Sequence, residues 1–159
     1  MSAILELLRN QPTRQFAAGE TVLGQGDQTG LLYILIEGSV EVIKDDVQVA
    51  KSSEAGAIFG DLSALLDVPH TAAVRALKPC QFYVVSDARA FLRDNSALCI
   101  LLCELLARRL DAVNKYLVDV KQQFAGDDHL GMVDGVLDTL MHRQPRQRIA
   151  PRASTLRDP

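Results

Sequence analysis

The sequence predicts a mainly β domain, an antiparallel roll or barrel with flanking α-helices, which is followed by one long helix. Seven of the ten glycines precede residue 61, and they separate short runs rich in Val, Ile, Leu and Tyr, as turns separate strands. Between Asn95 and Phe124 there is neither Gly nor Pro, and apolar residues recur at steps of three and four, which is typical of a helix. A chain of 159 residues is the size of one domain, so we expect a single core.

Composition and charge exclude several classes of protein. Hydrophobic residues make up 48% of the chain and charged residues 23%, which is enough apolar surface for a folded core. The net charge of -3 gives no general attraction to nucleic acid or to anionic lipid. The first residues, Met1 to Arg9, are unlike a signal peptide, and no apolar run approaches the roughly 20 residues of a membrane span. We therefore expect a cytoplasmic protein with no membrane partner.

The cysteines fit that compartment. Cys80, Cys99 and Cys103 form an odd set without a disulfide framework, so we expect reduced and buried thiols. Cys99 and Cys103 share one helix face, but no nearby His or third Cys completes a metal site. The sequence predicts neither a bound metal nor a cofactor.

The predicted strands are short. Leu31–Ile36 is an apolar run, and alternating apolar residues on either side of Asp45-Asp46 predict a hairpin with its turn at these aspartates. Two further strands are expected at Thr71–Leu77 and Gln81–Val85, separated by Lys78-Pro79. Strands of this length, joined by tight turns, favour an antiparallel roll.

The long helix predicts a dimer. Its part up to about Leu106 is expected to face the core of the domain, whereas beyond Leu110 charged residues flank an apolar stripe that needs cover from a second subunit. We therefore expect a homodimer, held by a helix at about 95–124 that completes a domain of residues 1–124. The stripe consists of Cys99, Cys103, Leu106, Leu110, Val113, Leu117, Val120 and Phe124.

The C-terminal residues predict one more helix and a tail. Gly126 ends the long helix, and Asp127 or Asp128 is suited to cap an extra helix within residues 125–142. Residues 143–159 are rich in Arg and Pro and lack apolar periodicity, so we expect a disordered tail. Either the tail is simply solvated, or its arginines contact an acidic partner or nucleic acid. One apolar face of the extra helix is formed by Leu130, Val133, Leu137 and Leu140.

One segment carries the chemistry. Residues 58–76 run from a strand through Gly60 into a short helix and back to a strand, an arrangement that suits an anion. Gly60 lets backbone approach a ligand closely, and the N–H groups of Leu62 and Ser63 at the helix start have no intrahelical partners. Asp61 adds an acceptor, although a carboxylate at a helix start is also a favourable end charge.

This segment, Phe59 to Leu66 followed by Pro69-His70-Thr71-Ala72, resembles the phosphate-binding loop of the cyclic nucleotide-binding domain family, which typically reads Phe-Gly-Glu-Leu-Ala-Leu-Leu and then Pro-Arg-Thr-Ala-Thr-Val. The resemblance covers about residues 12–124. It implies an antiparallel, jelly-roll-like β-roll of eight strands that holds cyclic AMP or cyclic GMP in this phosphate-binding cassette, with a following helix that closes over the base. Four further segments carry it in family order: Phe16–Val22, Gln25–Asp27, Leu32–Val42 and Ala107–Leu110.

The resemblance also implies roles for single residues. The backbone of Gly60, Leu62 and Ser63 would contact the phosphate, and the shorter Asp61 would take the place of the glutamate that accepts the ribose 2′-hydroxyl. His70 stands where the family normally places an arginine that pairs with the phosphate, and imidazole offers one donor and only partial charge at neutral pH. The expected ligand-binding residues are Phe59, Gly60, Asp61, Leu62, Ser63, His70, Thr71, Ala72 and Asn114.

Thr71 and Asn114 are the two members of that set with a second explanation. Thr71 either helps recognise guanine or phosphate or is an ordinary strand threonine. Asn114, on the long helix, either offers its amide to a base edge or faces solvent.

Two functions remain open. The chain is expected to be a regulatory sensor whose bound cyclic nucleotide reorders the long helix and so changes a dimer or protein-partner surface. Alternatively the pocket no longer takes a nucleotide, and the domain is a constitutive dimerisation or interaction module. An enzyme is not expected, because Ser63, Asp61 and His70 lack the sequence context of a hydrolase. Residues 125–159 are too few for a helix-turn-helix module, so no direct contact with nucleic acid is expected.

Overall fold

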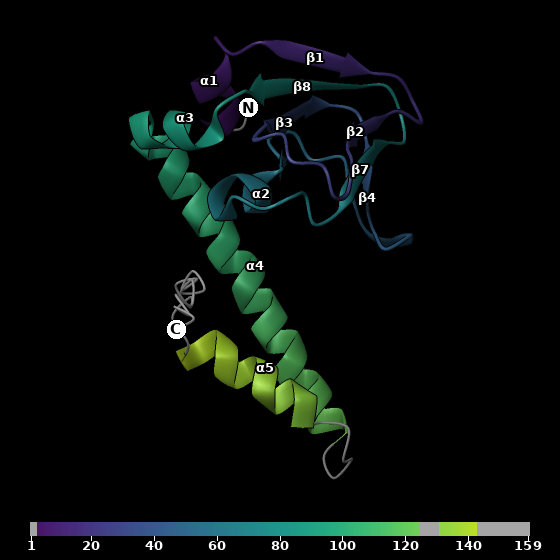
Figure 1. The fold of residues 1–159 in the computed structure, drawn as a ribbon, viewed down its shortest axis with the longest axis vertical. Coiled ribbons are helices and arrows are strands. Elements are labelled where there is room, and N and C mark those ends of the chain that lie inside the picture. Colours follow the sequence, from purple (N-terminus) through teal and green to yellow (C-terminus); the bar gives the residue numbers. More distant parts are fainter. Residues whose placement is uncertain (1–2, 125–130, 143–159) are drawn as a thin grey trace, which may run out of the picture. The chain divides into compact units, whose positions relative to one another are not determined.

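The computed structural model describes residues 3–124 and 131–142 of the chain. Its eight strands form two four-stranded sheets, and every strand pairing in them is antiparallel (Figure 1). The first sheet has the order β1-β8-β3-β6 and the second the order β2-β7-β4-β5. This confirms the predicted antiparallel roll. The strands are β1 (Thr13–Phe16), β2 (Thr21–Leu23), β3 (Leu32–Glu37), β4 (Val40–Lys44), β5 (Val47–Ser52), β6 (Ile58–Phe59), β7 (Ala73–Ala76) and β8 (Cys80–Val85).

The core lies between the two sheets. Aromatic side chains of the first sheet pack edge to face around Phe82, which Phe16, Tyr33 and Phe59 all approach with ring centroids 5.7 to 6.3 Å from its own. Such pairs add to the roughly 1.5–3 kcal/mol gained by burying each large apolar side chain. From the second sheet the same cluster receives Val22, Leu23, Val40, Val74 and Ala76.

The predicted hairpin is confirmed. Asp45 and Asp46 connect β4 to β5 with φ of +49° and +64°, the backbone that a two-residue hairpin turn requires and that Asp tolerates. The strand predicted from Thr71 is shorter than expected, because β7 begins only at Ala73. The chain before it is held elsewhere, since both backbone groups of His70 bond to residues 26 and 27 instead of to a strand.

Three short helices flank the roll: α1 (Ala3–Leu8), α2 (Asp61–Leu66) and α3 (Ala88–Asp94). α3 was not predicted from the sequence; Asp87 caps its N-terminus, and the carboxylate of this residue accepts a hydrogen bond from the N–H of Ala90 at 3.1 Å. α2 follows β6 directly and packs against α3.

The long helix α4 runs from Ser96 to Gln123. Its buried residues are Leu98 and Leu102, whereas Cys99 is half-buried and Cys103 is exposed. The first part of the helix thus faces the core as predicted, and Cys80 is buried as predicted, but the expectation that the stripe through Cys99 and Cys103 makes this contact, with both of these thiols buried, is wrong. The core-facing stripe lies one residue earlier, which is about 100° around the helix.

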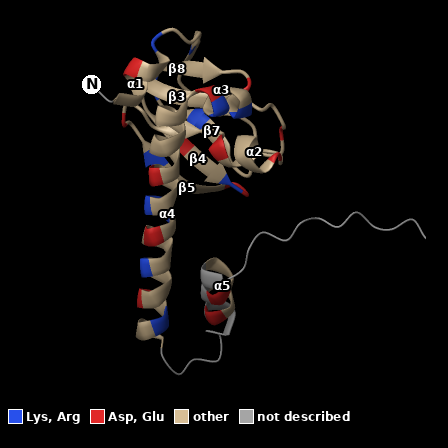
Figure 2. Ribbon diagram, turned by 90° about the vertical axis from the view of Figure 1, so that its left-hand side faces the viewer, with Lys and Arg blue, Asp and Glu red and all other residues tan. Residues whose placement is uncertain are grey.

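The chain divides into two compact units, residues 1–104 with the roll and residues 105–159. The second unit contains the rest of α4 and α5 (Gly131–His142), which the ion pair between Lys121 and Asp134 joins. Charged residues alternate in sign along α4 (Figure 2), and Lys115 pairs with Asp111 one turn away at 2.7 Å. The predicted caps at Asp127 and Asp128, Leu130 and the predicted tail at 143–159 lie outside the described residues.

Several large apolar side chains of this unit are exposed. Three of them, Leu110, Val113 and Phe124, belong to the predicted stripe, and Leu117 and Val120 of the same stripe are half-buried. None of the helices in the described ranges has the length and hydrophobicity needed to cross a membrane.

Candidate functional site

The turn from β6 into α2 brings bare backbone to the surface of the roll. Gly60 has a φ of +87°, and a Cβ at this position would lie 2.5 Å from the carbonyl oxygen of Leu31, so a side chain fits neither the conformation nor the space. α2 starts at the next residue, and the first N–H groups of a helix have no partner within it. The turn thus presents backbone donors at a point where a ligand meets no side chain from Gly60.

Both polar side chains at the start of α2 are buried. Asp61 is 6% exposed and Ser63 is 5% exposed. The hydroxyl of Ser63 donates to the carbonyl of Val68 at 2.5 Å and closes the far end of the cassette, where Asp67 takes a left-handed φ of +54°. The hydroxyl of Ser63 is therefore used within the cassette, and its predicted contact with an anion could come only from its backbone N–H. The side chain of Leu62 is exposed.

His70 lies against the cassette. Its side chain is 4% exposed, and its Cε1 is 3.6 Å from the position that a Cβ on Gly60 would take. Its Nε2 lies 2.8 Å from the hydroxyl oxygen of Thr29. Burial lowers the pKa of His70 below its usual value, and the negative charge of Asp27 offsets this only in part. The imidazole is therefore mostly neutral at pH 7.

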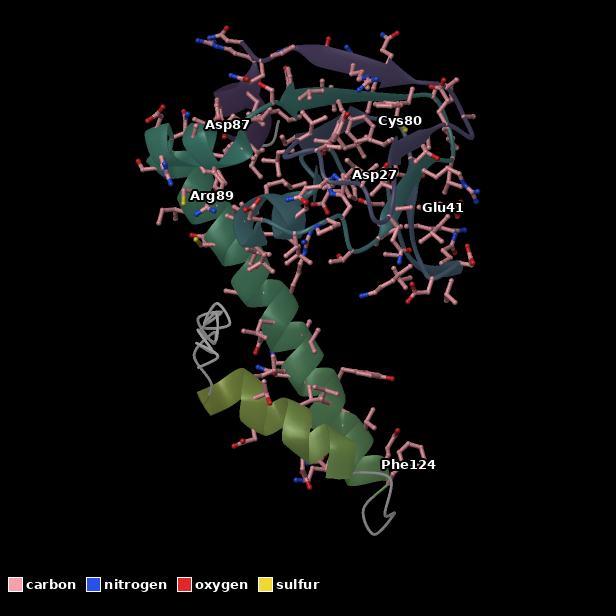
Figure 3. The ribbon with its side chains drawn as sticks, in the orientation of Figure 1. Asp27, Glu41, Cys80, Asp87, Arg89 and Phe124 are labelled. Atoms are coloured by element: carbon pink, nitrogen blue, oxygen red, sulfur yellow. The ribbon has the colours of Figure 1, made fainter. Side chains whose placement is uncertain are left out.

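The loop between β2 and β3 holds both ends of the cassette. The N–H of His70 donates to the carbonyl of Asp27 at 2.8 Å, and the carbonyl of His70 accepts from the N–H of Gly26 at 2.9 Å. At the other end, the amide of Gln28 donates to the carboxylate of Asp67 at 3.2 Å. Figure 3 labels Asp27 within this loop. These contacts were not predicted from the sequence. Residues 25–27 match a family segment there, but no sequence pattern links them to His70.

The other predicted site residues are Phe59, Thr71, Ala72 and Asn114. Phe59 is buried in the core cluster, where it packs against Phe82. Thr71 is exposed and Ala72 half-buried, both in the bend that precedes β7. Asn114 belongs to the second unit, so its predicted contact with a nucleotide in the cassette stays a prediction. Its Oδ1 is buried and has no hydrogen-bond partner among the described residues, which leaves an acceptor unused.

A pocket of about 280 Å³ lies beside the cassette, between α2 and the start of α3. Asp87 and Arg89, labelled in Figure 3, come from the α3 side. Sequence reasoning did not anticipate it, because its walls are far apart in the chain. The pocket is lined by Gln28, Gly30, Ser63, Ala64, Asp67, Ser86, Asp87, Ala88 and Arg89.

The chemistry of the cassette is that of anion binding. Backbone N–H groups beside a glycine without a side chain, a buried carboxylate one residue on and an imidazole against that glycine are groups that recognise a phosphate and a neighbouring hydroxyl. Among the described residues no group of three or more His, Cys, Asp or Glu side chains is arranged to hold a metal ion. The fold and the cassette together define a ligand-binding β-roll.

Comparison with known proteins names the family. Residues 13–93, about half of the chain, match the cyclic nucleotide-binding domain, and the chain belongs to this family. It is 37% identical over 78 residues to a cAMP-dependent protein kinase regulatory subunit of Yarrowia lipolytica, an alignment that covers 49% of this chain and 20% of that protein. It is 30% identical over 113 residues to cGMP-dependent protein kinase isozyme 1 of Drosophila melanogaster, an alignment that covers 71% of this chain and 14% of that protein. The chain thus spans a small part of these relatives.

Solved structures show the same fold. The structure of the Thermus thermophilus catabolite activator protein superposes with a TM-score of 0.65 at 23% identity, over 76% of this chain and 60% of that one. The N-terminal domain of a transcriptional regulator from Streptomyces coelicolor A3(2) superposes with a TM-score of 0.52 at 26% identity, over 69% of this chain and 83% of that one. These likenesses agree with the predicted jelly-roll-like β-roll and its long helix.

Proposed function

We propose that this chain is a regulatory sensor domain that binds cyclic AMP or cyclic GMP in the cassette at residues 59–72. The observation that carries the proposal is the turn at Gly60. Its backbone carries no side chain, the first N–H groups of α2 follow it, and the ring of His70 lies beside it. Family membership supports the same ligand class, because the family binds cyclic nucleotides. In this arrangement the backbone of Gly60, Leu62 and Ser63 contacts the cyclic phosphate.

Asp61 and His70 complete the proposed contacts. The carboxylate of Asp61 accepts the ribose 2′-hydroxyl, directly or through a water molecule, and its burial at the start of α2 supports a fixed position for it. His70 donates one hydrogen bond to the phosphate, and its Cε1 beside Gly60 supports that role. Phe59 supports the cassette through its place in the core, and we propose that Thr71 and Ala72, in the bend after His70, also contact the ligand.

One observation favours the alternative, a cassette that no longer binds nucleotide and a domain that serves as a constitutive dimerisation or interaction module. His70 is buried, mostly neutral and already bonded to Thr29. Removing one partner of a buried charge pair costs roughly 2–5 kcal/mol, which corresponds to about 30-fold to several thousand-fold in affinity. The proposed sensor therefore binds more weakly than a site with arginine at this position.

The proposed output is α4 and the stripe on its second half. A homodimer through Leu110, Val113, Leu117 and Val120 would cover side chains that are exposed or half-buried in the single chain. Asn114, on the same helix, offers an unused acceptor to a base or to a second subunit. We propose that ligand binding changes this surface and so regulates a protein partner in the cytoplasm, where the three free cysteines are stable as thiols.

Titration calorimetry tests the ligand. Cyclic AMP, cyclic GMP and, as control, linear 5′-AMP are titrated into the wild-type chain and into the Asp61→Ala and Glu54→Ala variants. The proposal expects saturable binding of at least one cyclic nucleotide, weaker binding by Asp61→Ala and unchanged binding by Glu54→Ala, which removes the same charge at an exposed turn. Absence of heat with both cyclic nucleotides at millimolar concentration supports the interaction module instead.

A further inference from the structure

Thr29 links the loop between β2 and β3 to the ring of His70. The hydroxyl oxygen of Thr29 accepts a hydrogen bond from the N–H of Leu31 at 3.2 Å and lies 2.8 Å from Nε2 of His70. A hydroxyl has a single hydrogen. Because the hydroxyl of Thr29 acts as acceptor toward Leu31, that hydrogen is left for His70.

The hydrogen bonds of Thr29 favour one tautomer of the His70 ring. The hydroxyl oxygen of Thr29 accepts a hydrogen bond from the N–H of Leu31. Its own hydrogen is then donated to Nε2 of His70, so Nε2 is the unprotonated ring nitrogen. Each group in this short chain is then satisfied, and each bond polarises the next. The opposite tautomer, with hydrogen on Nε2, makes the hydroxyl accept twice and leaves its own hydrogen to solvent, to which Thr29 is exposed, so the chain of bonds is interrupted. The proton on a neutral imidazole is set by the bond that the other nitrogen makes, so it belongs on Nδ1.

We propose that Thr29 is a positioning residue that keeps the proton of neutral His70 on Nδ1, so that the ring has a hydrogen-bond donor for an anion at the cassette in both of its charge states. This rests on the proposed function of the cassette. Nε2 is taken by Thr29, so Nδ1 is the ring nitrogen left for a ligand, and Cε1, to which both nitrogens are bonded, lies against Gly60. When His70 takes up a proton, the hydroxyl of Thr29 turns and accepts from Nε2 instead, and the donor on Nδ1 stays.

The tautomer affects anion binding because His70 is mostly neutral at pH 7. Asp27, in the loop, favours the imidazolium, but burial outweighs it and lowers the pKa of His70. The buried carboxylate of Asp61 follows Gly60 at the start of α2 and is a second negative group on the cassette side. Since the neutral ring predominates at pH 7, an anion meets the neutral form in most molecules. Without a fixed tautomer, part of these molecules would present the lone pair of Nδ1 to a negative phosphate.

The tautomer is measured on the free protein, so this test does not depend on whether a nucleotide binds. Nitrogen-15 NMR of histidine-labelled protein above the pKa of His70 distinguishes a protonated from an unprotonated ring nitrogen. We expect the proton of His70 on Nδ1 in the wild type and in Thr29→Ser, and a mixture or the Nε2 form in Thr29→Val, which keeps the shape and removes the hydroxyl. A wild-type proton on Nε2, or an unchanged tautomer in Thr29→Val, overturns the proposal.

Affinity against pH provides a second test in the presence of ligand. Titrated with cyclic AMP and cyclic GMP, Thr29→Val should lose about 10-fold or more in affinity at pH 8, where the ring is neutral, and less at pH 5.5, where both nitrogens of the imidazolium carry hydrogen. Thr29→Ser should stay close to the wild type at both. An equal loss at both pH values would assign Thr29 to holding the loop only. If the wild type binds neither nucleotide, the proposed function fails, and the NMR result still decides the role of Thr29.

Discussion

Gly60 and Leu31 approach each other more closely than any side chain would allow: a Cβ on Gly60 would lie 2.5 Å from the carbonyl oxygen of Leu31. The φ of +87° at Gly60 excludes side chains for a second reason. This contact fixes the turn between β6 and α2 against the start of β3, and it sets the direction in which the backbone donors of the cassette point. The geometry that makes the turn suitable for an anion is therefore also a packing contact of the roll.

The first prediction concerns Gly60→Ala. It should destabilise the protein by about 3 kcal/mol or more, because the left-handed backbone costs roughly 1–2 kcal/mol for alanine and the contact with Leu31 adds to it. Gly19→Ala is the matched control, since Gly19 has the same φ of +87° with nothing within 4 Å of its Cβ position, and it should lose only the backbone part. Urea unfolding of both variants measures the difference in the free energy of unfolding. An equal loss in the two variants would show that the contact with Leu31 does not contribute.

The second prediction concerns Asp61 and the ribose. If the carboxylate of Asp61 accepts the 2′-hydroxyl, the wild type should bind a cyclic nucleotide about 10-fold more tightly than its 2′-deoxy analogue, and Asp61→Ala should bind the two equally. Asp61→Glu, which restores the family's longer side chain, should keep the preference. A preference that survives in Asp61→Ala would place the ribose contact on another residue.

The third prediction concerns a pair that supports the roll. Glu41 on β4 lies opposite Arg75 on β7, and Arg75 and then Gln48 donate hydrogen bonds that lower the pKa of Glu41 below its usual value of 4.5. The folded form thus holds the ionised carboxylate, and its contribution to stability is present above pH 4.5 and is lost as the pH falls through the lowered pKa.

Urea unfolding from pH 3 to 7 measures this contribution. Glu41→Gln should be less stable than the wild type at neutral pH, and the difference should shrink as the pH falls below about 4.5. Glu37→Gln, at the exposed end of β3, should follow the wild type throughout. A constant difference between Glu41→Gln and the wild type at all pH values would show that charge is not what stabilises the pair.

The fourth prediction concerns the dimer. The wild type should be dimeric at tens of micromolar, and Leu117→Asp should make it monomeric, because a carboxylate cannot be buried in the apolar stripe without a large cost. Val118→Asp is the control, since Val118 is exposed and lies about 100° around the helix from Leu117. Sedimentation velocity measures both. A monomeric wild type would overturn the dimer, and dissociation by both variants would move the interface off the stripe.

The fold was predictable because its signals are local. Glycine spacing marks the turns, the Asp45-Asp46 pair marks the hairpin, and the change of period marks the long helix, all within short windows of sequence. The phase of α4 was not predictable in the same way. Its first turns carry apolar residues almost all round, from Leu98 to Cys103, so the period alone could not choose between the stripe at Leu98 and Leu102 and the one at the cysteines.

The site was predictable only in part. The turn at Gly60 follows from neighbouring residues, but the partner of His70 does not, because Thr29 lies 41 residues away and no feature of the loop distinguishes it from its polar neighbours. The same holds for the pocket between α2 and α3, whose walls meet only through tertiary packing. Sequence patterns thus predicted a candidate cassette, and the structure was needed to find the groups that contact His70.

The pH dependence of nucleotide affinity tests the central claim, that His70 meets the phosphate. The singly charged cyclic phosphate favours the imidazolium, so the pKa of His70 in the complex lies above the lowered pKa of the free protein, and binding takes up a proton. Calorimetric titrations of the wild type with cyclic AMP and cyclic GMP between about pH 5.5 and 8 should show the tightest binding below the free-state pKa, a decline through the window between the two values and a plateau above it. His70→Arg should bind more tightly and without this slope. A wild-type affinity that does not change with pH would remove His70 from the phosphate contact, and no binding by either protein would contradict the sensor itself.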